Sequence, residues 1–351
     1  MTASSKTLIS GRLLVRSVVW NLGGLAAPMV VALFAIPLLI DGFGKDRFGL
    51  LAIIWMGVGY FSLFDMGFGR ALTKLIADRL GSGDTQDLGS LIWTALAMML
   101  VFGVAGAAVV SLCAAPVVLH VLNVAAGLQA EGTAAMQTLA VGIPAVVVSA
   151  GLIGILEAHQ RFATISAVRI PLGVLTFAGP LISLQFSSSL VWATLALIIA
   201  RLMALCGFFF FAASVRPDLK YPALPRKKHV LPLFQFGGWL TVTNIISPLM
   251  VYFDRFLIGT VMAMSAVTYY VTPYEVIYRL QILPNAMMTV LFPALATARS
   301  IDKTRLAVIY ARASRGLLLV MLPVLSAFFL FAPEALDIWL GPDFRRMSTP
   351  V

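Results

Sequence analysis

Residues 252–296 have the sequence YFDRFLIGTVMAMSAVTYYVTPYEVIYRLQILPNAMMTVLFPALA, and they belong to a long apolar hairpin, residues 235–298. Charged residues interrupt the apolar runs at four positions: Asp254, Arg255, Glu275 and Arg279. At the centre of a membrane helix each such charge costs roughly 2.5 to 3.5 kcal/mol. Charges persist there only if they pair, face water or contact a ligand, so the stretch predicts a membrane hairpin and points to transport.

The composition predicts an all-α polytopic membrane protein. Of the 351 residues, 60% are hydrophobic and 11% are charged, and the mean hydropathy is +0.96, which excludes a soluble globular enzyme. A bilayer core about 30 Å thick needs about 20 apolar residues per helix. We predict nine spans: Leu14–Ile40, Phe48–Ala77, Leu88–Leu119, Ala134–Ala158, Ala167–Phe186, Leu190–Ala213, Pro232–Gly259, Ala266–Ala298 and Leu306–Ala332. The first is too long for a cleaved signal peptide.

The net charge of +10 is a topology signal more than a sign of nucleic acid. Most of the 25 Lys and Arg residues fall in the tail and loops that a cytoplasmic N-terminus would place inside, which predicts a periplasmic C-terminus. The longest polar break is a Pro-rich, basic segment, residues 214–231. We therefore predict a six-helix bundle (1–213), a basic cytoplasmic linker (214–231) and a partial bundle of three helices (232–351).

Four passages in order carry a family resemblance. They are the first helix with Asn21, Gly23, Pro28 and Pro37, leading into LLIDGFGKDRFGLLAI (38–53); FDMGFGRALTKLIADRLGSGD (64–84); the stretch 252–296; and IWLGPDF (338–344). On these residues the chain resembles the polysaccharide transporter (Wzx-type flippase) family of the multidrug/oligosaccharidyl-lipid/polysaccharide (MOP) exporter superfamily. The resemblance implies two six-helix bundles around a central cavity that opens alternately to the two sides.

The resemblance also sets expectations for cargo and setting. It implies flipping of an undecaprenyl-diphosphate-linked oligosaccharide across a bacterial inner membrane, in O-antigen (lipopolysaccharide), capsule or exopolysaccharide biosynthesis. The implied partners are this glycolipid, membrane lipids and, beyond them, a polysaccharide polymerase and other glycan assembly proteins; no cofactor or metal is implied. Only three spans follow the linker, so we expect either a truncated chain, which we favour, or a surface supplied by another subunit.

Arg201 is the candidate cavity cation. It lies in the span ALIIARLMALCGFFF (196–210), with no acidic residue nearby on its own helix. Its guanidinium could bind diphosphate oxygens bidentately, or it could extend to an interface or pair with an acid on a neighbouring helix. The polar residues Asn21, Asn244 and Gln281 are expected to form interhelical hydrogen bonds, with sugar contacts as the alternative.

The other charges within spans have two interpretations each. Asp254, Arg255, Glu275 and Arg279 either neutralise one another or form a periplasmic-side gate and ion-coupling site, with Glu275 as the proton carrier. Asp65 either caps or pairs locally with Arg70 and Lys74, or serves as a hinge and cytoplasmic gate.

Enzyme classes find no support in the motifs. The sequence has no Walker loop, HExxH or nucleophile elbow, and its three histidines show no metal-like spacing. The acidic loop that contains Asp78, Asp84 and Asp87 is interpreted as solvated. Two alternatives to a flippase remain: a multidrug and toxin extrusion antiporter, whose cavity should be acidic, and a non-transporting remnant or accessory subunit.

Overall fold

The computed structural model describes residues 11–84, 87–221, 223–281, 284 and 303–348. These residues form helices and turns, and no strand occurs among them, which confirms the all-α class. Contacts divide the chain into two compact units, Met1–Ser265 and Ala266–Val351. The division into 1–213, 214–231 and 232–351 stays a prediction.

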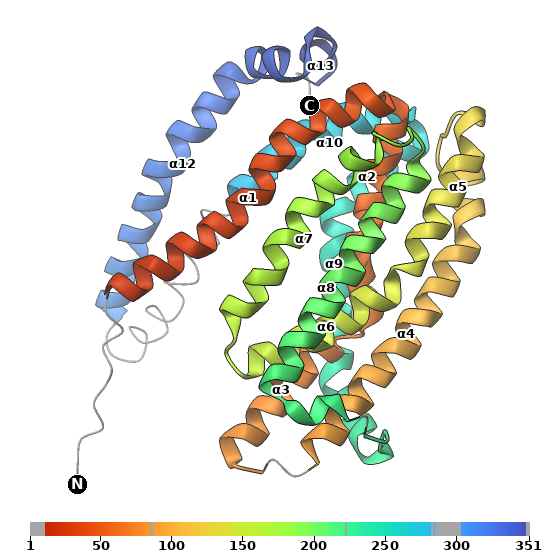
Figure 1. Cartoon of the computed structure of the whole chain (residues 1–351). Helices are drawn as coiled ribbons and strands as arrows, with labels where there is room; N and C mark the ends of the chain where they lie inside the picture. Colours follow the sequence, from red (N-terminus) through yellow and green to blue (C-terminus); the bar gives the residue numbers. More distant parts are fainter. Residues whose placement is uncertain (1–10, 85–86, 222, 282–283, 285–302, 349–351) are drawn as a thin grey trace. The chain divides into compact units, whose positions relative to one another are not determined.

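The first unit is a bundle of helices that stand side by side in Figure 1. Its elements are α1 Gly11–Phe43, α2 Lys45–Tyr60, the 3-10 helix η1 Phe61–Asp65, α3 Phe68–Ser82, α4 Leu88–Pro116, the π-helical turn η2 Val117–Val121, α5 Ala126–Val141, α6 Ile143–Ala158, α7 Phe162–Ser183, α8 Leu190–Val215, the 3-10 helix η3 Pro217–Lys220 and α9 Lys227–Val261. The second unit contains most of α10 Met264–Tyr278, the 3-10 helix η4 Arg279–Gln281, α12 Lys303–Leu340 and α13 Pro342–Ser348.

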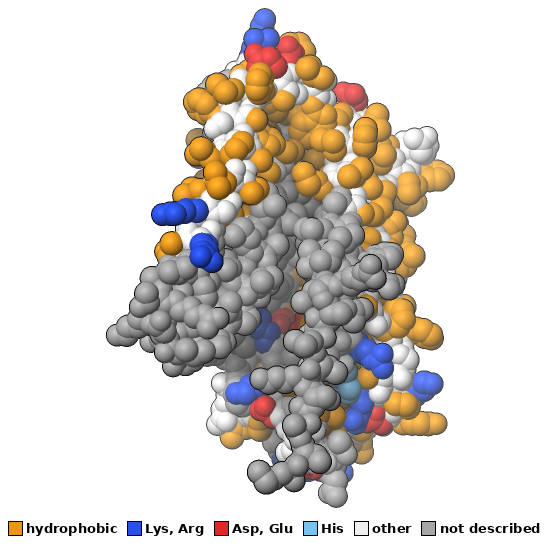
Figure 2. Space-filling view, turned by 90° about the vertical axis from the view of Figure 1, so that its left-hand side faces the viewer, with side chains coloured by type: hydrophobic (Ala, Val, Ile, Leu, Met, Phe, Trp, Pro, Cys, Tyr) orange, Lys and Arg blue, Asp and Glu red, His pale blue; other side chains and the backbone are white. Residues whose placement is uncertain are grey.

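Apolar length identifies the membrane-crossing helices. Among the described residues, the stretches long and apolar enough to cross a bilayer are Leu88–Val121, Ala126–Ala158, Phe162–Ser183, Leu190–Val215 and Tyr310–Leu340. Hydrophobic side chains cover much of the described surface in Figure 2, as a lipid-facing surface requires. The chain is thus a multi-pass membrane protein, while the number of nine spans stays a prediction.

The predicted second span, Phe48–Ala77, is not one continuous α-helix. The chain passes from α2 through η1 into α3, and Met66 and Gly67 have φ angles of 50° and 71° in the left-handed region. A right-handed helix cannot continue through such residues. The buried Asp65 side chain caps the start of α3 after this break, because its Oδ1 accepts a hydrogen bond from the Gly69 N–H at 2.9 Å.

Helix α9 packs against this break. The rings of Phe234 on α9 and Phe68 on α3 meet edge to face, with centroids 5.1 Å apart. A Cβ atom at Gly237 would lie 2.6 Å from the Met66 carbonyl oxygen, so only glycine allows the approach. At the far end of α9 the Gly259 carbonyl accepts a hydrogen bond from the Asn123 N–H at 2.8 Å. Contacts along its length therefore place α9 with the first unit.

The Glu131 carboxylate on α5 joins the ends of α2 and α8. Its Oε2 lies 3.1 Å from Arg47 Nε on α2, and its Oε1 accepts a hydrogen bond from the Leu190 N–H at 2.6 Å. The Leu190 N–H belongs to the first turn of α8, where amide groups have no partner within the helix. One carboxylate thus holds three helices at the same level.

We expect Glu131→Ala to lower the free energy of unfolding by about 1 to 2 kcal/mol, since it removes both a helix cap and a part-buried ion pair. Arg47→Gln removes only the ion pair and should cost less, because Arg47 is partly exposed. Thermal or denaturant unfolding in detergent measures both. Equal losses for the two variants would contradict the capping role of Glu131.

Candidate functional site

Arg201 occupies the buried seam of α8. The buried residues of this helix recur at alternating steps of three and four: Leu190, Thr194, Leu197, Ala204 and Phe208. Position 201 follows Leu197 by four and precedes Ala204 by three, so it continues the same stripe. The arginine therefore extends from the face of α8 that packs into the bundle, and its side chain is half-buried.

Arg201 lies near the middle of its helix. Arg201 lies 11 residues from the start of α8 and 14 from its end, Val215. At 1.5 Å per residue these are distances of about 16 and 21 Å along the axis, farther than one side chain reaches. The Arg201 Nε atom is buried without a hydrogen-bond partner, and no ion pair of this residue occurs among the described residues.

Trp55 adds a second buried donor to the same bundle, which sequence reasoning missed. Its Nε1 is buried without a hydrogen-bond partner among the described residues, and its ring packs against Phe48 and Phe177, with centroids 5.8 and 5.3 Å apart. Trp55 follows Arg47 by eight residues, and Arg47 lies at the level of Leu190. Trp55 and Arg201 are thus both well inside the bundle, and both have an N–H group available to an acceptor.

The charged hairpin is described only in part. Arg255 is 4% exposed and its guanidinium lies 5.2 Å from the centre of the Tyr252 ring, while Asp254 Oδ1 accepts a hydrogen bond from the Arg255 backbone N–H at 2.8 Å. Glu275 is half-buried on α10, in the second unit. The side chain of Arg279 lies outside the described residues. Neutralisation among these four charges, and a gating or ion-coupling role for them, stay predictions.

The polar candidates are also described only in part. The side chains of Asn21 and Asn244 lie outside the described part of the chain, and Gln281 is exposed in η4. Asp65 lies at the break between α2 and α3, where it caps Gly69. Its role as a gate, like the sugar contacts of the other three, stays a prediction.

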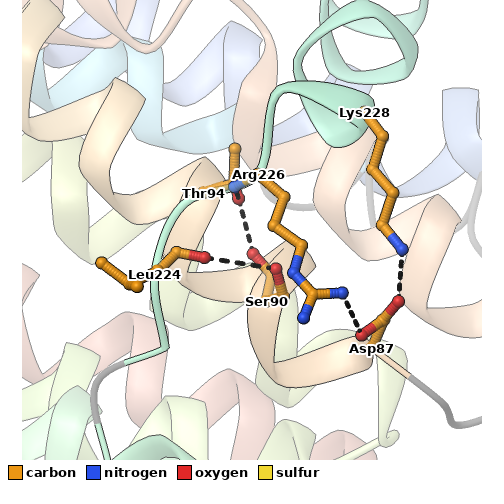
Figure 3. A network of polar contacts seen from close by, with 6 residues as sticks. All are labelled: Asp87, Ser90, Thr94, Leu224, Arg226 and Lys228. Atoms are coloured by element: carbon orange, nitrogen blue, oxygen red, sulfur yellow. Dashed lines mark hydrogen bonds and ion pairs between the residues drawn. The ribbon is translucent and has the colours of Figure 1, made fainter.

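A polar network ties the linker to the start of α4 (Figure 3). Asp87 precedes α4 with a φ of 58°, and its carboxylate does not cap the helix. Instead Oδ1 accepts a hydrogen bond from Arg226 Nη1 at 2.8 Å, and Oδ2 accepts one from Lys228 Nζ. The hydroxyl of Thr94 accepts a hydrogen bond from the Arg226 N–H at 3.0 Å, and the hydroxyl of Ser90 donates to the Leu224 carbonyl at 3.4 Å.

This network was not visible in the sequence. Asp87 and Arg226 are 139 residues apart, and a polar loop with several acidic residues resembles any solvated loop. Because two cations from the linker share one carboxylate at the start of α4, the contact can hold the beginning of α9 against the first bundle. It is thus a second site, separate from Arg201.

Comparisons with known proteins agree with this architecture. A family model described as polysaccharide biosynthesis protein matches residues 43–349. A Shigella flexneri protein named "Putative O-antigen transporter" is 30% identical over 340 residues, which are 95% of this chain and 78% of that protein.

Solved structures show the same fold. An inward-facing multidrug resistance transporter of the MATE family aligns with a TM-score of 0.75 at 15% identity, over 93% of this chain and 78% of the other. A MOP superfamily transporter from Pyrococcus furiosus aligns with a TM-score of 0.63 at 14% identity, over 93% and 74% of the two chains. These relatives are transporters and not enzymes. The chain therefore belongs to the polysaccharide biosynthesis protein family and has the fold of the MOP superfamily transporters.

Proposed function

We propose that this protein flips an undecaprenyl-diphosphate-linked oligosaccharide across the bacterial inner membrane, from the cytoplasmic to the periplasmic leaflet, by alternating access. The family and the name of the Shigella flexneri relative support a role in polysaccharide transport. The orientation with a cytoplasmic N-terminus rests on the distribution of Lys and Arg. A polysaccharide polymerase is the proposed downstream partner.

The position of Arg201 on the packed face of α8, with a buried Nε that lacks a described partner, is the observation that carries the proposal. No covalent bond changes in such transport, but a diphosphate and sugars must cross about 30 Å of hydrocarbon. A half-buried guanidinium whose buried Nε has no partner among the described residues is costly, and a diphosphate would supply acceptor oxygens in a bidentate arrangement. The Trp55 N–H would offer a neutral donor to the same polar cargo.

The remaining candidates take supporting roles in this proposal. Asp65 and the hairpin charges Asp254, Arg255, Glu275 and Arg279 would control opening, with Glu275 carrying a coupling proton. Asn21, Asn244 and Gln281 would contact the sugars. Alternating access requires helices to bend when the cavity opens. The left-handed residues Met66 and Gly67, which interrupt the helix, would be one such bending point.

A multidrug antiporter is the competing hypothesis, because a multidrug resistance transporter of the MATE family has the same fold as this chain. Its amphipathic cationic cargo would be repelled by Arg201, whose charge is not neutralised by any described residue. The charge of the transported molecule therefore distinguishes a glycolipid flippase from a multidrug antiporter.

Reconstitution of the full chain in proteoliposomes tests the choice directly. We expect a polyprenyl-diphosphate oligosaccharide to become accessible to a glycan-modifying enzyme outside the vesicles faster than in protein-free vesicles, and an amphipathic dye cation not to be transported. The same chain should restore surface polysaccharide in a flippase-null bacterial strain. Transport of the cation without the glycolipid would overturn the proposal.

A further inference from the structure

Basic side chains at the start of α9 share one acidic residue in the network of Figure 3. This basic cluster consists of Arg226 and Lys228 at the start of α9 and His229 in its first turn, with Asp87 as its carboxylate. The charge of Arg79, in the last turn of α3, also acts on His229. Two permanent positive charges of the cluster thus share one negative charge. The side chains of Arg226 and Lys228 are about half exposed, so their remaining N–H groups are open to water.

His229 is the unusual member of the cluster. It is 3% exposed, and its Nε2 is buried without a hydrogen-bond partner among the described residues. Burial lowers the pKa of His229, and the charges of Arg79, Lys228 and Arg226 lower it further, while Asp87 opposes them. The imidazole is therefore neutral at pH 7, with a ring nitrogen that lacks a partner at the edge of an electropositive surface.

Two carboxylates near the cluster already have cationic partners. Asp87 faces it from α4 and already accepts bonds from Arg226 and Lys228. Asp218, which lies near Gly89 at the start of α4, pairs with Arg216 at 2.6 Å. An arriving diphosphate, which has more charge and more acceptor atoms than a carboxylate, would satisfy the cations better than Asp87 does.

We propose that the basic cluster binds the phosphate of a membrane lipid, which replaces Asp87 as the partner of Arg226 and Lys228 and so releases the start of α9 from α4. Phosphate and Asp87 compete for the same two cations. Phosphate binding therefore favours separation of α9 from Asp87, and separation of α9 from Asp87 in turn favours phosphate binding. The proposal rests on the proposed function only where the phosphate is that of the glycolipid cargo; an anionic phospholipid head group offers phosphate oxygens of the same kind, with a single negative charge.

Histidine NMR can test the site without any transport assay. The chain has three histidines, His120, His159 and His229, so isotope labelling of histidine in the full chain gives three signals, and His229→Gln assigns one of them. In phosphatidylcholine nanodiscs, inorganic pyrophosphate should shift the His229 signal and raise the pKa of His229, because a nearby anion favours the imidazolium. The His159 signal, whose Nδ1 lies 2.9 Å from the Ile155 carbonyl, should not move.

Matched variants separate the cluster from general charge effects. The double variant Arg226→Gln, Lys228→Gln should lose the shift, whereas Lys220→Gln, which removes an exposed cation elsewhere in the linker, should keep it. Asp87→Asn removes the competing anion, so pyrophosphate should bind several-fold more tightly. The unchanged His120 and His159 signals report that each variant is folded. Weaker or equal binding in Asp87→Asn would overturn the exchange of partners.

Two further arms identify the lipid. A shift in nanodiscs that contain phosphatidylglycerol, without added ligand, identifies an ordinary phospholipid; a shift only with a polyprenyl diphosphate identifies the cargo. The absence of a shift with pyrophosphate and with both lipids overturns the site. Since none of these measurements involves transport, failure of the site and failure of the flippase proposal are distinguishable.

Discussion

Arg201→Gln is expected to abolish glycolipid transport while leaving the protein at least as stable as before. Loss of a buried, charge-assisted contact to a diphosphate costs about 2 kcal/mol or more, which is about 30-fold or more in transport rate or affinity. At the same time the variant no longer carries a half-buried guanidinium whose Nε has no described partner, so its desolvation penalty in the folded state is removed. Glycolipid translocation and thermal unfolding, measured on the same preparation, test both halves.

Two other substitutions sharpen the result. Arg201→Lys keeps the charge but loses the planar bidentate group, so it should retain partial transport. Arg169→Gln removes an exposed arginine from α7 in the same bundle and should leave transport unchanged. Full transport by Arg201→Gln would exclude Arg201 as the cargo cation, and a loss of stability in that variant would show that the arginine has a structural partner.

Gly154→Val is expected to prevent formation of the first bundle. A Cβ atom at Gly154 would lie 2.6 Å from the Gly69 carbonyl oxygen and 2.8 Å from Thr73 Oγ1, so α3 and α6 would have to separate. A backbone atom cannot rotate away, and valine adds two further carbon atoms; overpacking of this kind costs about 1 to 3 kcal/mol or more. The more favourable helix propensity of valine offsets only a few tenths of a kcal/mol. We expect little monodisperse protein by size-exclusion chromatography in detergent.

A glycine in open space provides the control. At Gly127 on α5 no heavy atom lies within 4 Å of a Cβ position, so Gly127→Ala should leave stability unchanged or raise it by about 0.5 to 1 kcal/mol through helix propensity. Wild-type yield and unfolding temperature in Gly154→Val would contradict the close crossing of α3 and α6.

The apolar runs determined where most helices lie. The predicted span Leu190–Ala213 corresponds to α8, Leu190–Val215, because a long apolar run has no alternative to a helix in a membrane. The predicted span Phe48–Ala77 did not reveal the break between α2 and α3. Hydropathy reports composition, whereas the break depends on the left-handed backbone at Met66 and Gly67 and on the hydrogen bond from Gly69 to Asp65.

The sequence by itself determined the membrane class, the family and the presence of an isolated charge at Arg201, because these follow from local composition and from motifs in order. Only the tertiary structure decided that Arg201 lies on the buried face of α8, and that Asp87 meets Arg226 and Lys228 from 139 and 141 residues away. Solvation and ion pairing depend on what packs around a charge, and a one-dimensional pattern does not contain that information.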